Sequence, residues 1–235
     1  MLRQSLRPAR LRVLTARSVP APIACAKLWR PYSDEAKTAI QPGSISEVIH
    51  QDHRQIEKYY DKIVNSSDHD VQRRYQNAFV WELARHAIAE ELVVYPSIET
   101  GLNDGREMAD KDRAEHQVAK EQLYTFQNLE PGDRHFIPTL EALMKDLKMH
   151  IKEEEEHDLV KLEAALVPSR SRKLAEQFEM TKAFTPTRSH PGAPNKPPFE
   201  TAVGLLTAPL DKIRDIFRSW PEEYSARPPS GGPSR

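Results

Sequence analysis

The stretch Leu147-Lys-Met-His150-Ile-Lys-Glu-Glu154-Glu155 decides the fold, because Leu83-Ala-Arg-His86-Ala-Ile-Ala-Glu90-Glu91 repeats its pattern earlier in the chain. Both read Leu-x-x-His-x-x-x-Glu-Glu, and both lie in long segments with helical apolar spacing and no glycine or proline. Residues four apart share one face of a helix, so each segment sets an imidazole beside a carboxylate. A buried carboxylate is costly unless it is paired or binds a metal. Two such faces predict a metal centre inside a helical bundle.

Four segments carry this helical spacing, and short turns separate them. The expected helices cover residues 44–65, 69–97, 107–128 and 135–166. Long helices joined by short loops are typical of an antiparallel bundle. We therefore predict an all-α fold, an up-down-up-down four-helix bundle over residues 44–166.

Each expected helix places one histidine on its apolar stripe, and the second and fourth helices add a glutamate one turn later. The candidate metal ligands are His53, His86, Glu90, His116, His150 and Glu154. Neutral imidazole and carboxylate suit iron, manganese and zinc. A single histidine on an apolar face is usually a core residue, and an isolated His-x-x-x-Glu arises by chance on charged helices. Two copies with two further inward histidines favour the metal site.

The neighbouring acidic residues are interpreted differently. Glu91, Glu153, Glu155 and Glu156 are expected on the solvated face rather than among the ligands. His50 and His157 lie near the predicted site and are considered as substitute ligands.

The order of these motifs resembles the hemerythrin-like, or HHE cation-binding, domain. The matching features are a histidine on the first helix, His-x-x-x-Glu followed by Tyr95-Pro96, Glu115-His116, and His-x-x-x-Glu-Glu. Ferritin-like di-iron bundles use Glu-x-x-His, with the reverse order and a different spacing. The resemblance covers about residues 44–166.

This resemblance implies a non-haem centre of two iron ions joined by an oxo or hydroxo group. By position, His53 and His86 would serve one iron, and His116 and His150 the other. Glu90 and Glu154 would then bridge the two ions.

Lys120 departs from the pattern of the reversible oxygen carriers in that family, which have a second histidine at this position. A protonated ammonium group cannot bind a metal. One iron would lack a protein ligand, and Lys120 is expected to pair with a bridging glutamate. The departure favours binding or sensing of oxygen, nitric oxide, peroxide or iron over reversible oxygen carriage.

Residues 1–32 have the composition of a mitochondrial transit peptide, with seven basic residues and no acidic one. Arg30-Pro-Tyr32-Ser33 resembles a matrix-peptidase cleavage site. The alternative is a basic tail that binds anionic surfaces. Removal of seven positive charges from a net charge of −1 leaves −8, which argues against nucleic acid as a partner. The single cysteine, Cys25, lies in this leader, so cysteine cannot ligate a metal in the mature chain. We expect a matrix protein.

Residues 167–235 form a different region, because 11 of the 19 prolines fall between residues 168 and 235. Short amphipathic helices are expected here, followed by a disordered end. Phe199 to Phe217 is predicted to fold back onto the bundle and hide apolar surface. A weak contact of residues 199–221 with a membrane or protein is the alternative. No run of 18 apolar residues occurs, so no transmembrane span is predicted.

Three classes of function remain open. The first is a non-enzymatic iron-binding protein with a small diatomic or peroxide ligand. The second is a di-iron oxidase or peroxidase, for which no phosphate loop, nucleophile elbow or other cofactor motif adds support. The third is a helical interaction module with a vestigial site.

Overall fold

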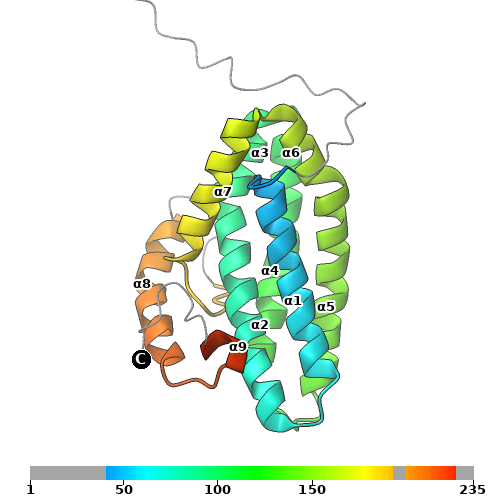
Figure 1. Cartoon of the computed structure of the whole chain (residues 1–235), viewed down its shortest axis with the longest axis vertical. Helices are drawn as coiled ribbons and strands as arrows, with labels where there is room; N and C mark the ends of the chain where they lie inside the picture. The colour runs from blue at the N-terminus through cyan, green and yellow to red at the C-terminus, as the bar shows by residue number, and fades with distance from the viewer. Residues whose placement is uncertain (1–40, 193–198, 226–235) are drawn as a thin grey trace, which may run out of the picture.

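The computed structural model describes residues 41–192 and 199–225, with side chains at 41–192 and 207–223, and this part is helical (Figure 1). The predicted leader 1–32 and the Pro/Gly/Ser-rich end from Arg227 lie outside the described residues. The helices are α1 Ile45–Val64, α2 His69–Ala89, α3 Tyr95–Gly101, α4 Gly105–Gln127, α5 Phe136–Glu153, α6 Leu159–Ala165, α7 Pro168–Lys182, α8 Phe199–Asp215 and α9 Glu222–Ser225.

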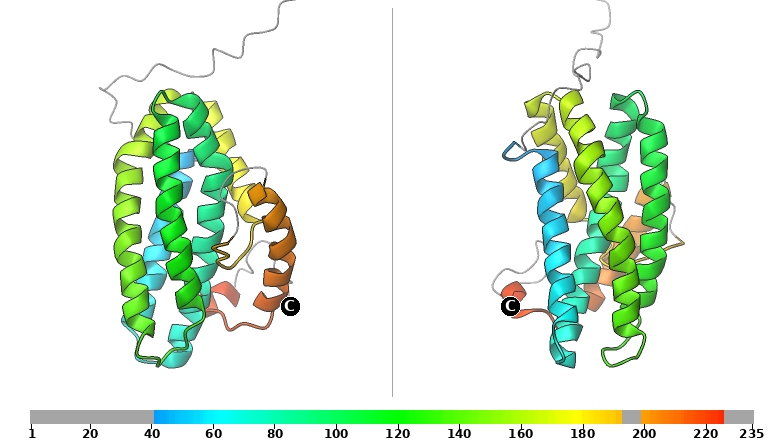
Figure 2. Two further views of the ribbon diagram at one scale, coloured as in Figure 1. Left: turned by 180° about the vertical axis from the view of Figure 1, so that it is seen from behind. Right: turned by 90° about the vertical axis from the view of Figure 1, so that its right-hand side faces the viewer.

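Helices α1, α2, α4 and α5 form the predicted antiparallel four-helix bundle (Figures 1 and 2). Helix α1 packs against α2 and α5, and α4 packs against the same two helices from the other side. Side-chain caps fix where two helices begin. The Ser44 hydroxyl accepts from the backbone N–H of Glu47, and Asp68 accepts from the first turn of α2. Such caps satisfy backbone donors that lack partners inside the helix.

The bundle core consists of two apolar clusters with a polar layer between them. One cluster includes Phe79, Phe126 and Leu140, and the other includes Ile49 and Leu162. The inward histidines and glutamates fall between these clusters along every bundle helix. The surrounding apolar packing therefore keeps bulk water away from the polar layer.

The second and fourth bundle helices are not continuous, in contrast to the predicted spans 69–97 and 135–166. Each contains a π-helical turn, η2 at Glu90–Val94 and η3 at Glu154–Asp158. Each turn begins at the glutamate of the His-x-x-x-Glu motif. A π turn holds an extra residue and rotates the side chains that follow it. Pro96 lies in the first turn of α3, where its missing N–H costs little.

Residues after the bundle pack back onto it. Helix α7 lies against α1, α2 and η2. Farther along, the Asn77 amide donates to the carbonyl of Ser219, and the rings of Trp81 and Trp220 are 6.4 Å apart. Residues 219 and 220 thus lie against α2. The predicted burial of apolar surface by Phe199 to Phe217 is not seen at Leu210, Ile213 and Phe217, which are exposed. The structure does not describe the side chains of residues 199–206.

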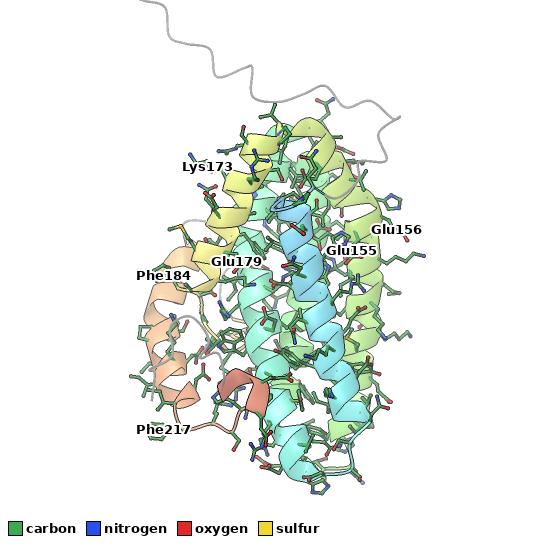
Figure 3. The ribbon with its side chains drawn as sticks, viewed as in Figure 1. Glu155, Glu156, Lys173, Glu179, Phe184 and Phe217 are labelled. Carbon is green, nitrogen blue, oxygen red and sulfur yellow. The ribbon has the colours of Figure 1, made fainter. Side chains whose placement is uncertain are left out.

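Part of this extension keeps apolar side chains on its outer surface. Phe184 and Phe217, labelled in Figure 3, are 68% and 84% exposed. Leu210 and Ile213 are exposed on α8. No helix of the described chain is long and apolar enough to cross a bilayer.

Candidate metal centre

The six sequence-predicted ligands meet in the middle of the bundle, and all are buried. Donor atoms of His53, His86 and Glu90 lie within 4.8 Å of one another, as do those of Glu90, His116 and His150. Glu90 belongs to both groups: its Oε1 is 3.2 Å from His86 Nε2, and its Oε2 is 3.4 Å from His116 Nε2. One carboxylate therefore stands between the two histidine pairs.

Glu90 and Glu154 supply four buried carboxylate oxygens that lack a hydrogen-bond donor among the described residues. Both side chains are fully buried. Glu154 Oε2 is 3.3 Å from His53 Nε2, which is also without a hydrogen bond in the described chain. Unpaired buried carboxylates are strongly unfavourable. Inward nitrogen and oxygen atoms of this kind fit a bound cation.

Each of the four histidines turns its other ring nitrogen, Nδ1, toward an outer carboxylate. The pairs are His53 with Glu155 at 2.9 Å, His86 with Asp52 at 3.2 Å, His116 with Glu91 at 3.4 Å and His150 with Glu115 at 2.8 Å. A carboxylate behind an imidazole fixes its orientation and increases its basicity as a ligand. The four Nε2 atoms are thereby held toward the centre.

Glu91 is not on the surface, and that prediction is wrong. Its side chain is fully buried, and Lys120 Nζ donates to Glu91 Oε2 at 2.6 Å. The physical reason is the π turn that begins at Glu90, because it rotates Glu91 inward beside its neighbour. The expected pairing of Lys120 with a bridging glutamate is corrected in the same way: its partner is Glu91.

The other neighbouring residues divide between site and surface. Glu155 is partly buried because it contacts His53 and accepts from Arg54 at 2.5 Å, whereas Glu153 and Glu156 are exposed as predicted. His157 is exposed. His50 Nδ1 lies 3.7 Å from Glu155 Oε2, and neither of these two histidines belongs to a donor cluster among the described residues.

Two buried residues near His116 were missed by the sequence analysis as site residues. The Tyr95 phenol lies 2.9 Å from His116 Nε2 and is fully buried. Asp112 is one turn before His116, and its Oδ2 lacks a hydrogen bond within the described chain. Burial and the Asp158 carboxylate raise the pKa of Asp112 to about 8. The four-residue spacing between Asp112 and His116 was the signal available in the sequence.

The surroundings of His53 and His86 shift their pKa values in opposite directions. Burial alone would lower the pKa of His53, but the adjacent Glu154 carboxylate and the hydrogen-bonded Glu155 carboxylate raise it to about 9. Burial lowers the pKa of His86 to about 4, although Asp52 opposes this change. Burial and the nearby Glu154 charge raise the pKa of Glu90 well above its ordinary value. The centre therefore retains protons that metal binding would displace.

Helix α7, beyond the bundle, supports one of these histidines. Lys182 Nζ donates to both oxygens of Asp52, at 2.7 and 2.6 Å, and the Lys182 side chain is buried. Glu82 lies 3.5 Å from the same ammonium group. Asp52 in turn contacts His86 Nδ1. The extension thus holds the carboxylate that orients a candidate ligand.

Comparison with known proteins agrees with this geometry. The hemerythrin HHE cation-binding domain matches residues 44–162. An uncharacterised hemerythrin-like protein of Schizosaccharomyces pombe is 52% identical over 178 residues, which cover 75% of this chain and 88% of that protein. The 178 aligned residues outnumber those of the family match at 44–162 by more than the 43 residues that precede that match. Part of the similarity must therefore follow residue 162. No solved structure matches the chain significantly.

Proposed function

The chain belongs to the hemerythrin HHE cation-binding family, and we propose that it holds a non-haem di-iron centre that binds or senses a small ligand. The observation that carries this proposal is the set of four unpartnered oxygens of Glu90 and Glu154. They are buried beside imidazole nitrogens that outer carboxylates orient. An N/O donor set of this kind suits iron, and the described site residues include no sulfur ligand.

In this proposal His53 and His86 would hold one iron and His116 and His150 the other, with Glu90 and Glu154 as the carboxylate ligands. Iron would supply redox chemistry and affinity for oxygen, nitric oxide or peroxide. The chain's own residues orient the imidazoles, exclude water and balance the cation charge. Glu91 contributes through His116 Nδ1, and Lys120 offsets the Glu91 charge.

The Lys120–Glu91 ion pair favours binding or sensing over reversible oxygen carriage. The ammonium group stands where the carriers of this family have a histidine, and it is held 2.6 Å from Glu91. As an ammonium group it cannot serve as a ligand. The iron served by His116 and His150 would therefore have fewer protein ligands and a position for an exogenous molecule.

The test is iron content and visible spectrum of the full chain after anaerobic iron loading. We expect about two irons per chain, with near-ultraviolet bands of a bridged ferric pair after oxidation. His86→Ala should lose iron, whereas the matched control His157→Ala changes an exposed histidine and should retain both ions. Equal iron content in wild type and His86→Ala would contradict the proposal.

We further propose that the protein acts in mitochondria, because residues 1–32 carry seven basic residues and no acidic one. Fusion of residues 1–40 to a fluorescent protein should direct it to the matrix. A variant with Arg3, Arg7, Arg10 and Arg12 changed to Ala should remain outside mitochondria. A matrix signal that persists without these arginines would contradict the leader proposal.

A further inference from the structure

A cavity lies beside the candidate metal centre, between the bundle and the segment 185–191, which we call the strap. Its volume is about 40 Å³, compared with roughly 10–15 Å³ for one water molecule. His86, His116 and His150 contribute to its wall. A molecule of two or three atoms in this cavity would lie next to imidazoles assigned above to iron.

The rest of the cavity wall is mainly aliphatic. Leu83, Leu123 and Leu147 line it together with Ala119. Two cationic residues also line the cavity: Lys120, whose ammonium group donates to Glu91, and Arg188 of the strap. A small uncharged molecule loses little on entering a mainly aliphatic space, whereas an ion must give up its hydration. The mainly aliphatic wall therefore favours a small uncharged molecule.

The strap supplies the outer wall through four residues, Pro186, Arg188, Ser189 and His190. A reciprocal pair of hydrogen bonds holds it to α4: Gln127 Nε2 donates to the Ser189 carbonyl at 3.1 Å, and the Ser189 N–H donates to Gln127 Oε1 at 3.0 Å. The Ser189 hydroxyl also donates to the Lys120 carbonyl at 2.5 Å. The strap is therefore fastened to the helix that carries His116.

The strap is also held from the side of α8. Thr187 donates to Asp215 at 2.6 Å, and His190 Nε2 lies 2.8 Å from Asp211. All of these residues follow the segment 44–162 that matches the family. The outer wall of the cavity is thus formed by a part of the chain outside the family domain.

We infer that the strap and bundle together form a binding cavity for an uncharged diatomic molecule, oxygen or nitric oxide, and that the strap restricts its entry to the centre. This inference rests on the proposed iron function for its reactive ligand. The cavity itself requires no metal, so it can be tested separately. Its position also predicts that the molecule approaches beside His86, His116 and His150.

Xenon and nitric oxide provide the two probes, each applied to the full chain. Xenon occupies dry apolar cavities, and its ¹²⁹Xe resonance reports binding without iron. Nitric oxide association with the reduced, iron-loaded chain is followed by stopped flow. Ala119→Leu fills the cavity from α4. The matched control, Ala114→Leu, adds the same side chain at an exposed position of that helix.

We expect Ala119→Leu to abolish the saturable xenon shift and slow nitric oxide association at least tenfold, with unchanged iron content. Ala114→Leu should change neither measurement. Gln127→Ala, which removes the reciprocal strap contact, should accelerate association several-fold. A retained xenon shift in Ala119→Leu would overturn the inference. An unchanged nitric oxide association rate in both Ala119→Leu and Gln127→Ala would also overturn it. If wild type binds no iron, the proposed function fails, and xenon alone decides whether the cavity exists.

Discussion

The two halves of the candidate centre differ in how tightly the protein surrounds them. On the α1 and α2 side, His53 is supported by Glu155, and His86 by Asp52 and Lys182. On the α4 and α5 side, His116 is supported by Glu91 and Lys120, and His150 by Glu115. Both of these histidines line the cavity, and His86 lines it from the other side. All four histidines thus have outer support, and the halves differ in access: both histidines of the α4 and α5 side line the cavity, whereas His86 alone does so from the other pair. The difference teaches that access can be divided unequally between two histidine pairs that share one carboxylate, Glu90.

Glu90 links the halves, so its loss should have the largest effect. Glu90→Ala removes oxygens placed 3.2 Å from His86 Nε2 and 3.4 Å from His116 Nε2. We expect iron content to fall from about two per chain to nearly zero, because both ions would lose a bridging ligand. Metal analysis after iron loading checks this. Glu156→Ala, at an exposed position, is the control, and loss of one ion only would show that Glu90 serves a single half.

A substitution at Lys120 tests the side of the centre that contains His116 and His150. Lys120→Met should destabilise the metal-free chain by about 3–5 kcal/mol, because it removes the cationic partner of a buried carboxylate. The charge left behind is that of Glu91, which is fully buried. Chemical denaturation measures the change. The double variant with Glu91→Gln should recover much of the loss, and a double variant as unstable as the sum of its parts would contradict this pairing.

The pH dependence of the stability of the metal-free chain depends on groups from both sides of the centre. The pKa of His53 is raised to about 9, mainly by Glu154 and Glu155 against the effect of burial, and burial raises that of Asp112 to about 8. From pH 6.5 to 8 the folded chain therefore binds more protons than the unfolded chain, and stability falls as pH rises. We expect a loss on the order of 2 kcal/mol across this range.

Thermal unfolding of the metal-free chain between pH 6.5 and 8 measures this loss. The lowered pKa of His86, about 4, contributes only at more acidic pH. Iron loading should reduce the slope, because metal replaces the extra protons. Stability that rises with pH in the metal-free chain would contradict the assignment of these protons.

A substitution at Lys182 tests the side of the centre that contains His53 and His86, and its expected effect on iron binding is smaller. Lys182→Met removes the cation that holds Asp52 behind His86. Loss of such an outer partner typically weakens metal binding by about 10- to 100-fold, and we expect the lower end of this range. Iron competition with a chelator measures it. The control Lys173→Met changes an exposed residue of the same helix, labelled in Figure 3. Equal iron affinities of Lys182→Met and Lys173→Met would show that Lys182 does not contribute to metal binding.

The sequence predicted the bundle and brought together the six candidate ligands because helical spacing reports which residues share a face. It misplaced Glu91 because a π turn changes the register, and packing of the whole bundle selects that turn. Neither the Asp52–Lys182 contact nor the strap has a local pattern, since each joins residues far apart in the chain. The predicted ligand roles and the matrix location remain predictions.

The most direct test of two unlike iron sites is Mössbauer spectroscopy of the full chain loaded with ⁵⁷Fe, together with its iron content. If two unlike histidine pairs share Glu90, the chain should bind about two irons and show two quadrupole doublets of equal area. In Lys182→Met, the doublet from the His53–His86 side should change while the other remains. A chain that binds no iron, or a single doublet with one iron per chain, would contradict the two-site centre.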